Sequence, residues 1–130
     1  MFESLNNLAK QNNCNISQKE QFSNFAIGLD ENRNYLFFYK NKKNKEIAQN
    51  INLADIQSCR ALNSGKIAGN GSGSSKLIDK LELGLTPKSN TGGDILLEFY
   101  SLEDSMQVNG ELQVLEKWVA LINDQLKRKR

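Results

Sequence analysis

Histidine is absent from the 130-residue chain, and proline occurs once, as Pro87. Without histidine, His-based acid–base catalysis, Ser-His and Cys-His nucleophile pairs and the commonest metal ligand are excluded. Long apolar runs are also missing, since no stretch approaches the ~20 residues that span a bilayer. With a mean hydropathy of −0.56, these absences predict a water-soluble protein with no catalytic residues, no metal site and no cofactor. The opening Met1-Phe2-Glu3-Ser4 does not resemble a secretory signal.

Cysteine is scarce as well, with only Cys14 and Cys59. Two cysteines without histidine cannot complete a zinc site, and these two are far from a C-x-x-C spacing. We interpret both as small buried residues of a protein in the reducing cytosol, because free cysteine is commonly buried. A disulfide and a reactive thiol are the alternatives.

Excess charge is small, because 17 basic and 15 acidic residues give +2. This balance is too weak for a general polyanion binder, and no nucleic acid partner is expected. Basic residues still gather in the tail 127–130 and in one predicted turn. A helix end whose dipole favours cations explains the tail, and solvation explains the turn. The turn could also touch an anionic membrane surface. The candidate surface-binding residues are Lys40, Lys42, Lys43 and Lys45 of this turn, together with Arg33 of another turn.

What the chain does contain is a period of two. The segments 25–29 and 35–40, separated by a polar turn, predict a β-hairpin. Further strands are predicted from a weak run at 14–22 and from the segments 47–53, 56–62, 76–86 and 95–101. The Gly- and Ser-rich segment 63–75 predicts a long flexible loop. It lacks the Gly-Lys-Ser/Thr ending of a phosphate-binding loop.

Both ends of the chain are predicted to be helical. Residues 2–11 carry a narrow apolar stripe, and such a short helix must dock or continue a helix that begins upstream. Residues 109–127 carry apolar side chains at spacings of three and four, with Trp118 beside the stripe. We therefore expect a strong amphipathic helix at 109–127.

The order of these elements predicts one α+β domain over 1–130. The connections are too short for crossover helices, so the strands of 14–101 should form an antiparallel sheet of six or seven strands. We expect a strongly bent barrel or sandwich capped by the C-terminal helix, with a short N-terminal helix. Its predicted core comprises Trp118, Phe25, Ile27, Phe37, Leu83, Leu97, Leu115 and Val119.

This pattern resembles the pleckstrin-homology-like (PH-like) barrel. Trp118, within Glu116-Lys117-Trp118-Val119, matches the helix Trp that packs into the barrel in that superfamily. Ile51-Asn52-Leu53-Ala54-Asp55-Ile56 resembles its usual step between the third and fourth strands, and Leu97-Glu98-Phe99-Tyr100-Ser101, followed by the helix, resembles the end of the domain. The resemblance covers about residues 15–126. An unrelated small barrel with a helical plug is the alternative.

The resemblance implies an interaction module. The lipid-binding cations of better-known members are missing, because the first hairpin turn offers only Arg33 beside Asp30 and Glu31. We expect instead a non-enzymatic module for a protein or peptide partner, which would add a strand at a sheet edge. The candidate edge is Ile47–Leu53, which we expect beside the final helix.

A second hypothesis is a membrane-proximal domain of a longer membrane protein, located in the cytoplasm at the inner face of the membrane. It would contact anionic lipid through the basic loops. Asp79 and Glu98 lie among apolar neighbours in the sequence. Nothing in the sequence places these two carboxylates together for acid–base chemistry. A barrel that carries a small ligand is a minor option, because a packed interior would leave no room.

Overall fold

The computed structural model describes residues 2–42, 44–68, 75–89, 93–102 and 110–129, with backbone only for 64–68 and 75–79. Helix α1 comes first, seven strands follow, and helix α2 comes last, which confirms the predicted order. The bounds are α1 Phe2–Gln11, β1 Gln18–Phe22, β2 Phe25–Asp30, β3 Tyr35–Lys42, β4 Lys45–Asn52, β5 Ile56–Ala68, β6 Ser75–Pro87, β7 Ile95–Ser101 and α2 Glu111–Arg128, with a 3-10 turn at Leu53–Asp55.

The strands form two antiparallel sheets. One sheet has the order β1-β2-β3-β4 and the other the order β5-β6-β7. The hairpin predicted at 25–29 and 35–40 is present as the β2–β3 pair. The α+β class is therefore confirmed, but a closed barrel is not, because strand pairing in the described residues leaves the two sheets separate.

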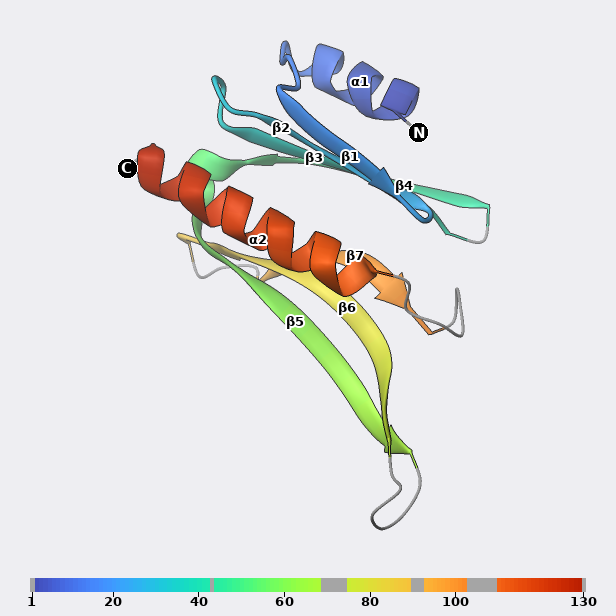
Figure 1. The fold of residues 1–130 in the computed structure, drawn as a ribbon. Coiled ribbons are helices and arrows are strands. Elements are labelled where there is room, and N and C mark those ends of the chain that lie inside the picture. Colours follow the sequence, from blue (N-terminus) through green and yellow to red (C-terminus); the bar gives the residue numbers. More distant parts are fainter. Residues whose placement is uncertain (1, 43, 69–74, 90–92, 103–109, 130) are drawn as a thin grey trace.

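The helices lie on different sides of the four-stranded sheet. Helix α1 covers the outer face of that sheet, whereas α2 lies between the two sheets and packs against β5, β6 and β7 (Figure 1). The layers are thus α1, the four-stranded sheet, α2, and the three-stranded sheet. The distal part of the β5–β6 hairpin extends beyond α2, and β7 pairs with β6 only at residues 80–85.

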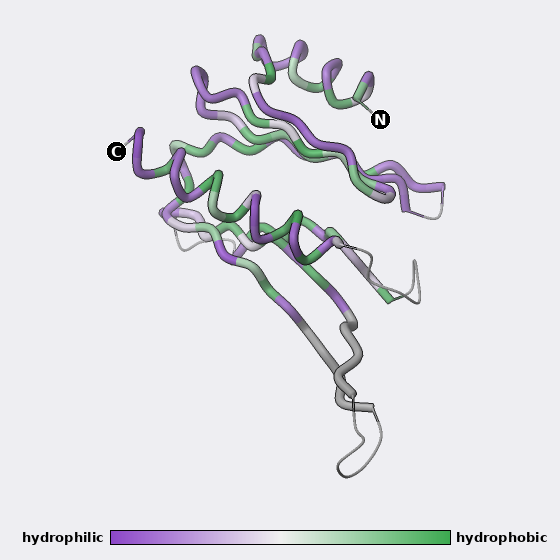
Figure 2. Tube along the Cα trace, in the orientation of Figure 1, coloured by the Kyte–Doolittle hydropathy of each residue, from purple (hydrophilic) through white to green (hydrophobic). Residues whose placement is uncertain are grey.

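The main core fills the space between the sheets and α2. Trp118, only 1% exposed, packs there with Phe25, Phe38, Phe99 and Leu115. Apolar residues concentrate in the middle of β2 and β3, and hydrophilic residues at their turns (Figure 2). Of the predicted core residues, Phe25, Ile27, Leu83, Leu97, Leu115 and Trp118 are buried in this cluster, and Val119 is partly buried against it.

Phe37 is buried, as predicted, but it lies on the other face of the sheet and not with the other predicted interior residues. It packs with Leu5 and Ala9 of α1 and with Ala26 in a second, smaller cluster. The physical reason is the period of two in a strand: Phe38 faces the main core, so Phe37 must face α1. Because β3 is apolar on both faces, its sequence alone did not decide between these two residues.

The predicted flexible loop at 63–75 is wrong over part of its length. Strand β5 continues to Ala68 and β6 begins at Ser75, with Gly65 opposite Ile78 across a register shift. Antiparallel pairing satisfies the backbone here in spite of the Gly- and Ser-rich sequence. Residues 69–74 of the predicted loop lie outside the described residues. Asn13, Asn34 and Asn44 have positive φ, a backbone conformation that asparagine tolerates in tight turns.

Candidate functional site at the edge of strand β4

The predicted basic turn is not a cluster of surface cations, because Lys40 is buried. Its side chain is 1% exposed, and Lys40 Nζ lies 2.9 Å from Glu98 Oε1 and 3.2 Å from the Glu98 carbonyl oxygen. Since Lys40 lies on β3 and Glu98 on β7, this ion pair joins the two sheets. Lys40 is therefore a structural cation, which corrects its proposed role in surface binding.

The remaining candidate cations are not brought together either. Lys42 Nζ lies 2.8 Å from the same Glu98 Oε1, Lys45 is exposed, and Lys43 lies outside the described residues. Arg33 is exposed in the β2–β3 turn, at the opposite end of the eight-residue strand β3. That separation is roughly 25 Å at 3.3 Å per residue.

Glu98 is held in an ion pair, and both cysteines are buried. Burial raises the pKa of Glu98, but hydrogen bonds from Lys42 and Lys40 outweigh it and hold that pKa below its ordinary value. The side chain of Asp79 lies outside the described residues. Cys14 and Cys59 are buried and unpaired, as interpreted from the sequence, and burial raises the pKa of Cys59 to about 12. No group of three potential metal ligands occurs in the part of the chain that the structure describes.

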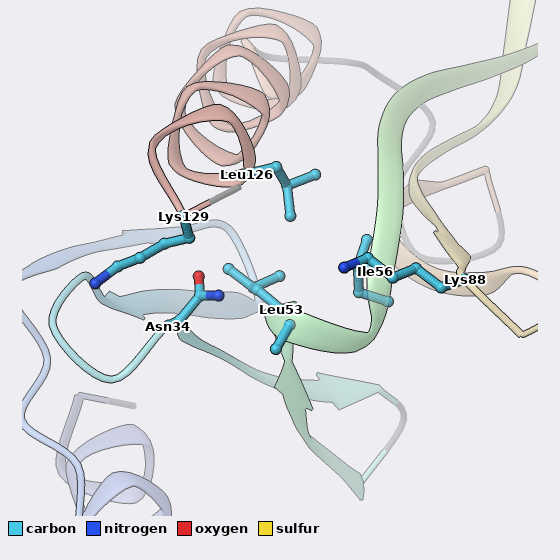
Figure 3. Close-up of a pocket in the computed structure, with 7 residues that line it drawn as sticks. Asn34, Leu53, Ile56, Lys88, Leu126 and Lys129 are labelled. Atoms are coloured by element: carbon cyan, nitrogen blue, oxygen red, sulfur yellow. The ribbon is translucent and has the colours of Figure 1, made fainter.

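The cavity at the C-terminal end of α2 is small. It has a volume of about 80 Å³ and lies where α2 ends above the 3-10 turn, lined by Asn34, Leu53, Ala54, Ile56, Lys88, Leu126 and Lys129. Lys129 points away from its apolar lining (Figure 3) and donates to the carbonyl oxygen of Asn32. The two lysines of this cavity therefore do not converge on a ligand position.

Among the outer strands of the two sheets, β4 is the most regular. Its register to β3 is continuous from Lys45 to Asn52, whereas β5 has two register shifts and the β6–β7 pair has one. Strand β1 has only five residues. A long, unbulged outer strand is the kind of edge that another chain can extend.

The hydrogen-bond phase identifies which β4 residues face outward. Leu53 N–H donates to the Asn34 carbonyl oxygen at 2.9 Å, and in an antiparallel ladder the bonded pairs alternate. Counting back along the register, Ile51, Gln49 and Ile47 bond to β3. The main-chain N–H and C=O groups of the intervening residues, Glu46, Ala48 and Asn50, therefore point away from the sheet.

One flank of α1 runs beside this edge and forms a groove with it. A cavity of about 260 Å³ is lined by Glu46, Ala48 and Tyr39 of the sheet and by Ser4, Asn7, Leu8 and Gln11 of α1. These four α1 residues follow the spacing of one helical stripe. The stripe is polar except at Leu8, so it offers hydrogen bonds to a chain lying along β4.

The other side of β4 offers an apolar contact. Ile47 is 38% exposed, one of two large hydrophobic side chains that stand out on the described surface. It lies on the same face as Ile51, beyond the part that the main core covers. An extended segment added to β4 would thus meet polar groups on its α1 side and Ile47 on the other.

The sequence predicted this strand edge, but it placed the wrong helix beside it and did not predict that α1 lines the groove. Residues 47–52 fall on the outer strand β4, as predicted, whereas Leu53 begins the 3-10 turn. Helix α2 packs on β5, β6 and β7 and not beside β4, so the predicted neighbourhood with the final helix is wrong. The α1 stripe could have been found from the spacing of Ser4, Asn7 and Gln11, had the exposed flank of that helix been considered.

No helix in the described part of the chain is long and apolar enough to cross a membrane. No protein-family model matches the chain, and neither a curated protein nor a solved structure matches it significantly. The function of the chain is therefore inferred from the geometry of the β4 edge.

Proposed function

We propose that this protein is a non-enzymatic, PH-like interaction module that binds an extended peptide segment of a partner protein at the β4 edge. The observation that carries the proposal is the uninterrupted β4 ladder with outward main-chain groups at Glu46, Ala48 and Asn50 beside the polar flank of α1. Main-chain bonds would supply attraction, and the two side-chain surfaces would supply selectivity.

The PH-like assignment within this proposal is supported by architecture. A four-stranded and a three-stranded antiparallel sheet precede a C-terminal helix, and that helix buries its one tryptophan, Trp118, between the sheets. The proposal also includes a cytoplasmic setting, in keeping with the two unpaired buried thiols of Cys14 and Cys59. We do not carry forward the contact with anionic lipid, because Lys40 is buried and Arg33 lies far from the lysines.

A proline at position 48 tests the proposal. Ala48→Pro removes an outward N–H, and an outward position on an outer strand tolerates proline. Ala48→Ser keeps that N–H and is the matched control, and Gln21→Pro places proline on β1, the opposite edge of the same sheet. The probe is a displayed library of unstructured decapeptides, selected against the full chain.

We expect selected peptides to bind the wild type, Ala48→Ser and Gln21→Pro, and to lose at least tenfold in affinity for Ala48→Pro. In amide exchange, a bound peptide should slow Glu46, Ala48 and Asn50 selectively. Peptides that bind Ala48→Pro as tightly as the wild type would refute the site, as would a library that yields no binder.

A further inference from the structure

Strand β5 is also an outer strand, but α2 covers one of its residues in an unusual way. Asn123 Oδ1 accepts a hydrogen bond from Cys59 N–H at 3.2 Å, and Asn123 Nδ2 donates to the Cys59 carbonyl oxygen at 2.9 Å. A carboxamide has the donor and acceptor of a peptide group. These are the two bonds that a residue on a neighbouring antiparallel strand would make with Cys59.

We propose that Asn123 caps the β5 edge at Cys59 and so blocks the addition of another strand at this point. The chain that Asn123 excludes is a second copy of this protein, because every strand edge is complementary to a copy of itself. The proposal concerns a different edge from the peptide site and does not depend on it.

The chemistry of position 123 favours asparagine. Cys59 is 6% exposed, so its N–H and C=O would lie largely shielded from water if the carboxamide were removed. Aspartate could accept from the N–H but could not donate to the C=O. Alanine could do neither, and it would leave both main-chain groups available for pairing.

The carboxamide of Asn123 occupies the pairing position of Cys59, and space remains next to it along the strand. A cavity of about 280 Å³ adjoins it, lined by Gln57 and Ser58 of β5 and by Asn123, Leu126 and Lys127 of α2. This cavity is large enough for a side chain of an added strand. Removing the carboxamide therefore enlarges an existing gap along the strand edge.

A matched control exists on the same helix. Gln125 Nε2 donates to the Glu31 carbonyl oxygen at 2.9 Å and to Asn34 Oδ1 at 3.1 Å. These bonds also hold α2 in place, but they go to the β2–β3 turn and not to a sheet edge. Gln125→Ala thus reports the loss of helix docking without opening an edge.

The experiment compares three forms of the 130-residue chain: the wild type, Asn123→Ala and Gln125→Ala. Amide exchange of Cys59 should quicken at least tenfold in Asn123→Ala and stay unchanged in Gln125→Ala. Sedimentation velocity over a concentration series should show self-association of Asn123→Ala at concentrations where the other two do not change. If Asn123→Ala does not fold, Asn123→Asp, which loses the bond to the Cys59 carbonyl oxygen, replaces it in the sedimentation series, and self-association is then the deciding readout. A Cys59 amide that stays protected, or association no greater than in Gln125→Ala, would overturn the proposal.

Discussion

Replacing Lys40 by methionine should destabilise the protein because it breaks the ion pair that joins the two sheets. Lys40 Nζ bonds both a carboxylate oxygen and the main-chain oxygen of Glu98, and the Lys40 side chain is 1% exposed. Removing one partner of a fully buried pair costs about 3–5 kcal/mol. Glu98 keeps Lys42 and is 18% exposed, so we expect the lower figure, about 3 kcal/mol.

The assay is urea unfolding followed by the fluorescence of Trp118, the one tryptophan of the chain, which is buried in the main core. A loss of this size corresponds to a fall in Tm of roughly 10 °C for a domain of this length. Lys45→Met is the matched control, since Lys45 belongs to the same turn but is exposed, and it should change stability by less than about 0.5 kcal/mol. Equal stability of Lys40→Met and Lys45→Met would refute the structural role of Lys40.

The same pair makes a pH-dependent contribution of known sign. The pKa of Glu98 is lowered in the folded protein, so the stability it adds is present above its unfolded pKa of about 4.3 and is lost as the pH falls through the lowered value. Glu98→Gln should therefore flatten the acid limb of the stability curve below about pH 5. A curve parallel to that of the wild type would contradict this reasoning.

Three further predictions concern other parts of the fold. Gly28→Val should lower the free energy of unfolding in urea by about 2 kcal/mol, because a Cβ there would lie 2.9 Å from Ile16 Cδ1 and 3.0 Å from Leu5 Cδ2. Unchanged stability would mean that α1 does not pack on this backbone. Asp30→Ala should lower the free energy of unfolding by about 2–3 kcal/mol at pH 7 and by less toward pH 2. Burial raises the pKa of Asp30, but hydrogen bonds from backbone N–H groups lower it overall. A loss of stability that is undiminished in acid would contradict the role of the charge. The native thiols should react with a disulfide reagent at pH 8 only as fast as the protein unfolds, because burial raises the pKa of both Cys14 and Cys59; rapid labelling before unfolding would disprove their burial.

Local patterns predicted the elements well because they depend on neighbours in the chain. The apolar spacing around Trp118 specified α2, and the alternation at 25–40 specified the first hairpin. Pairings between distant residues left no such trace. Lys40 has the appearance of a turn lysine until its partner 58 residues away is known, and Asn123 reads as an ordinary helix-surface residue although it bonds a residue 64 positions earlier.

The candidate site was predictable to a similar extent. Residues 47–53 could be recognised as a strand, and their place at a sheet edge could be guessed from the order of hairpins. The sequence could not show that α1 would form the second wall, because the docking of a ten-residue helix depends on which face of β3 it covers. Phe37 and Phe38 are equally apolar, so the sequence of β3 does not show which of its two faces α1 covers and which faces α2.

The position of α2 between the sheets has a consequence for biosynthesis. Leu115, Trp118 and Ile122 fill the space between the two sheets, yet they belong to a helix that leaves the ribosome after both sheets. Until that segment emerges, the facing apolar surfaces of both sheets are open to water and to other nascent chains. Folding of this chain must therefore finish after translation of residues 111–128, and a truncation before Glu111 should yield aggregates in place of a smaller folded protein.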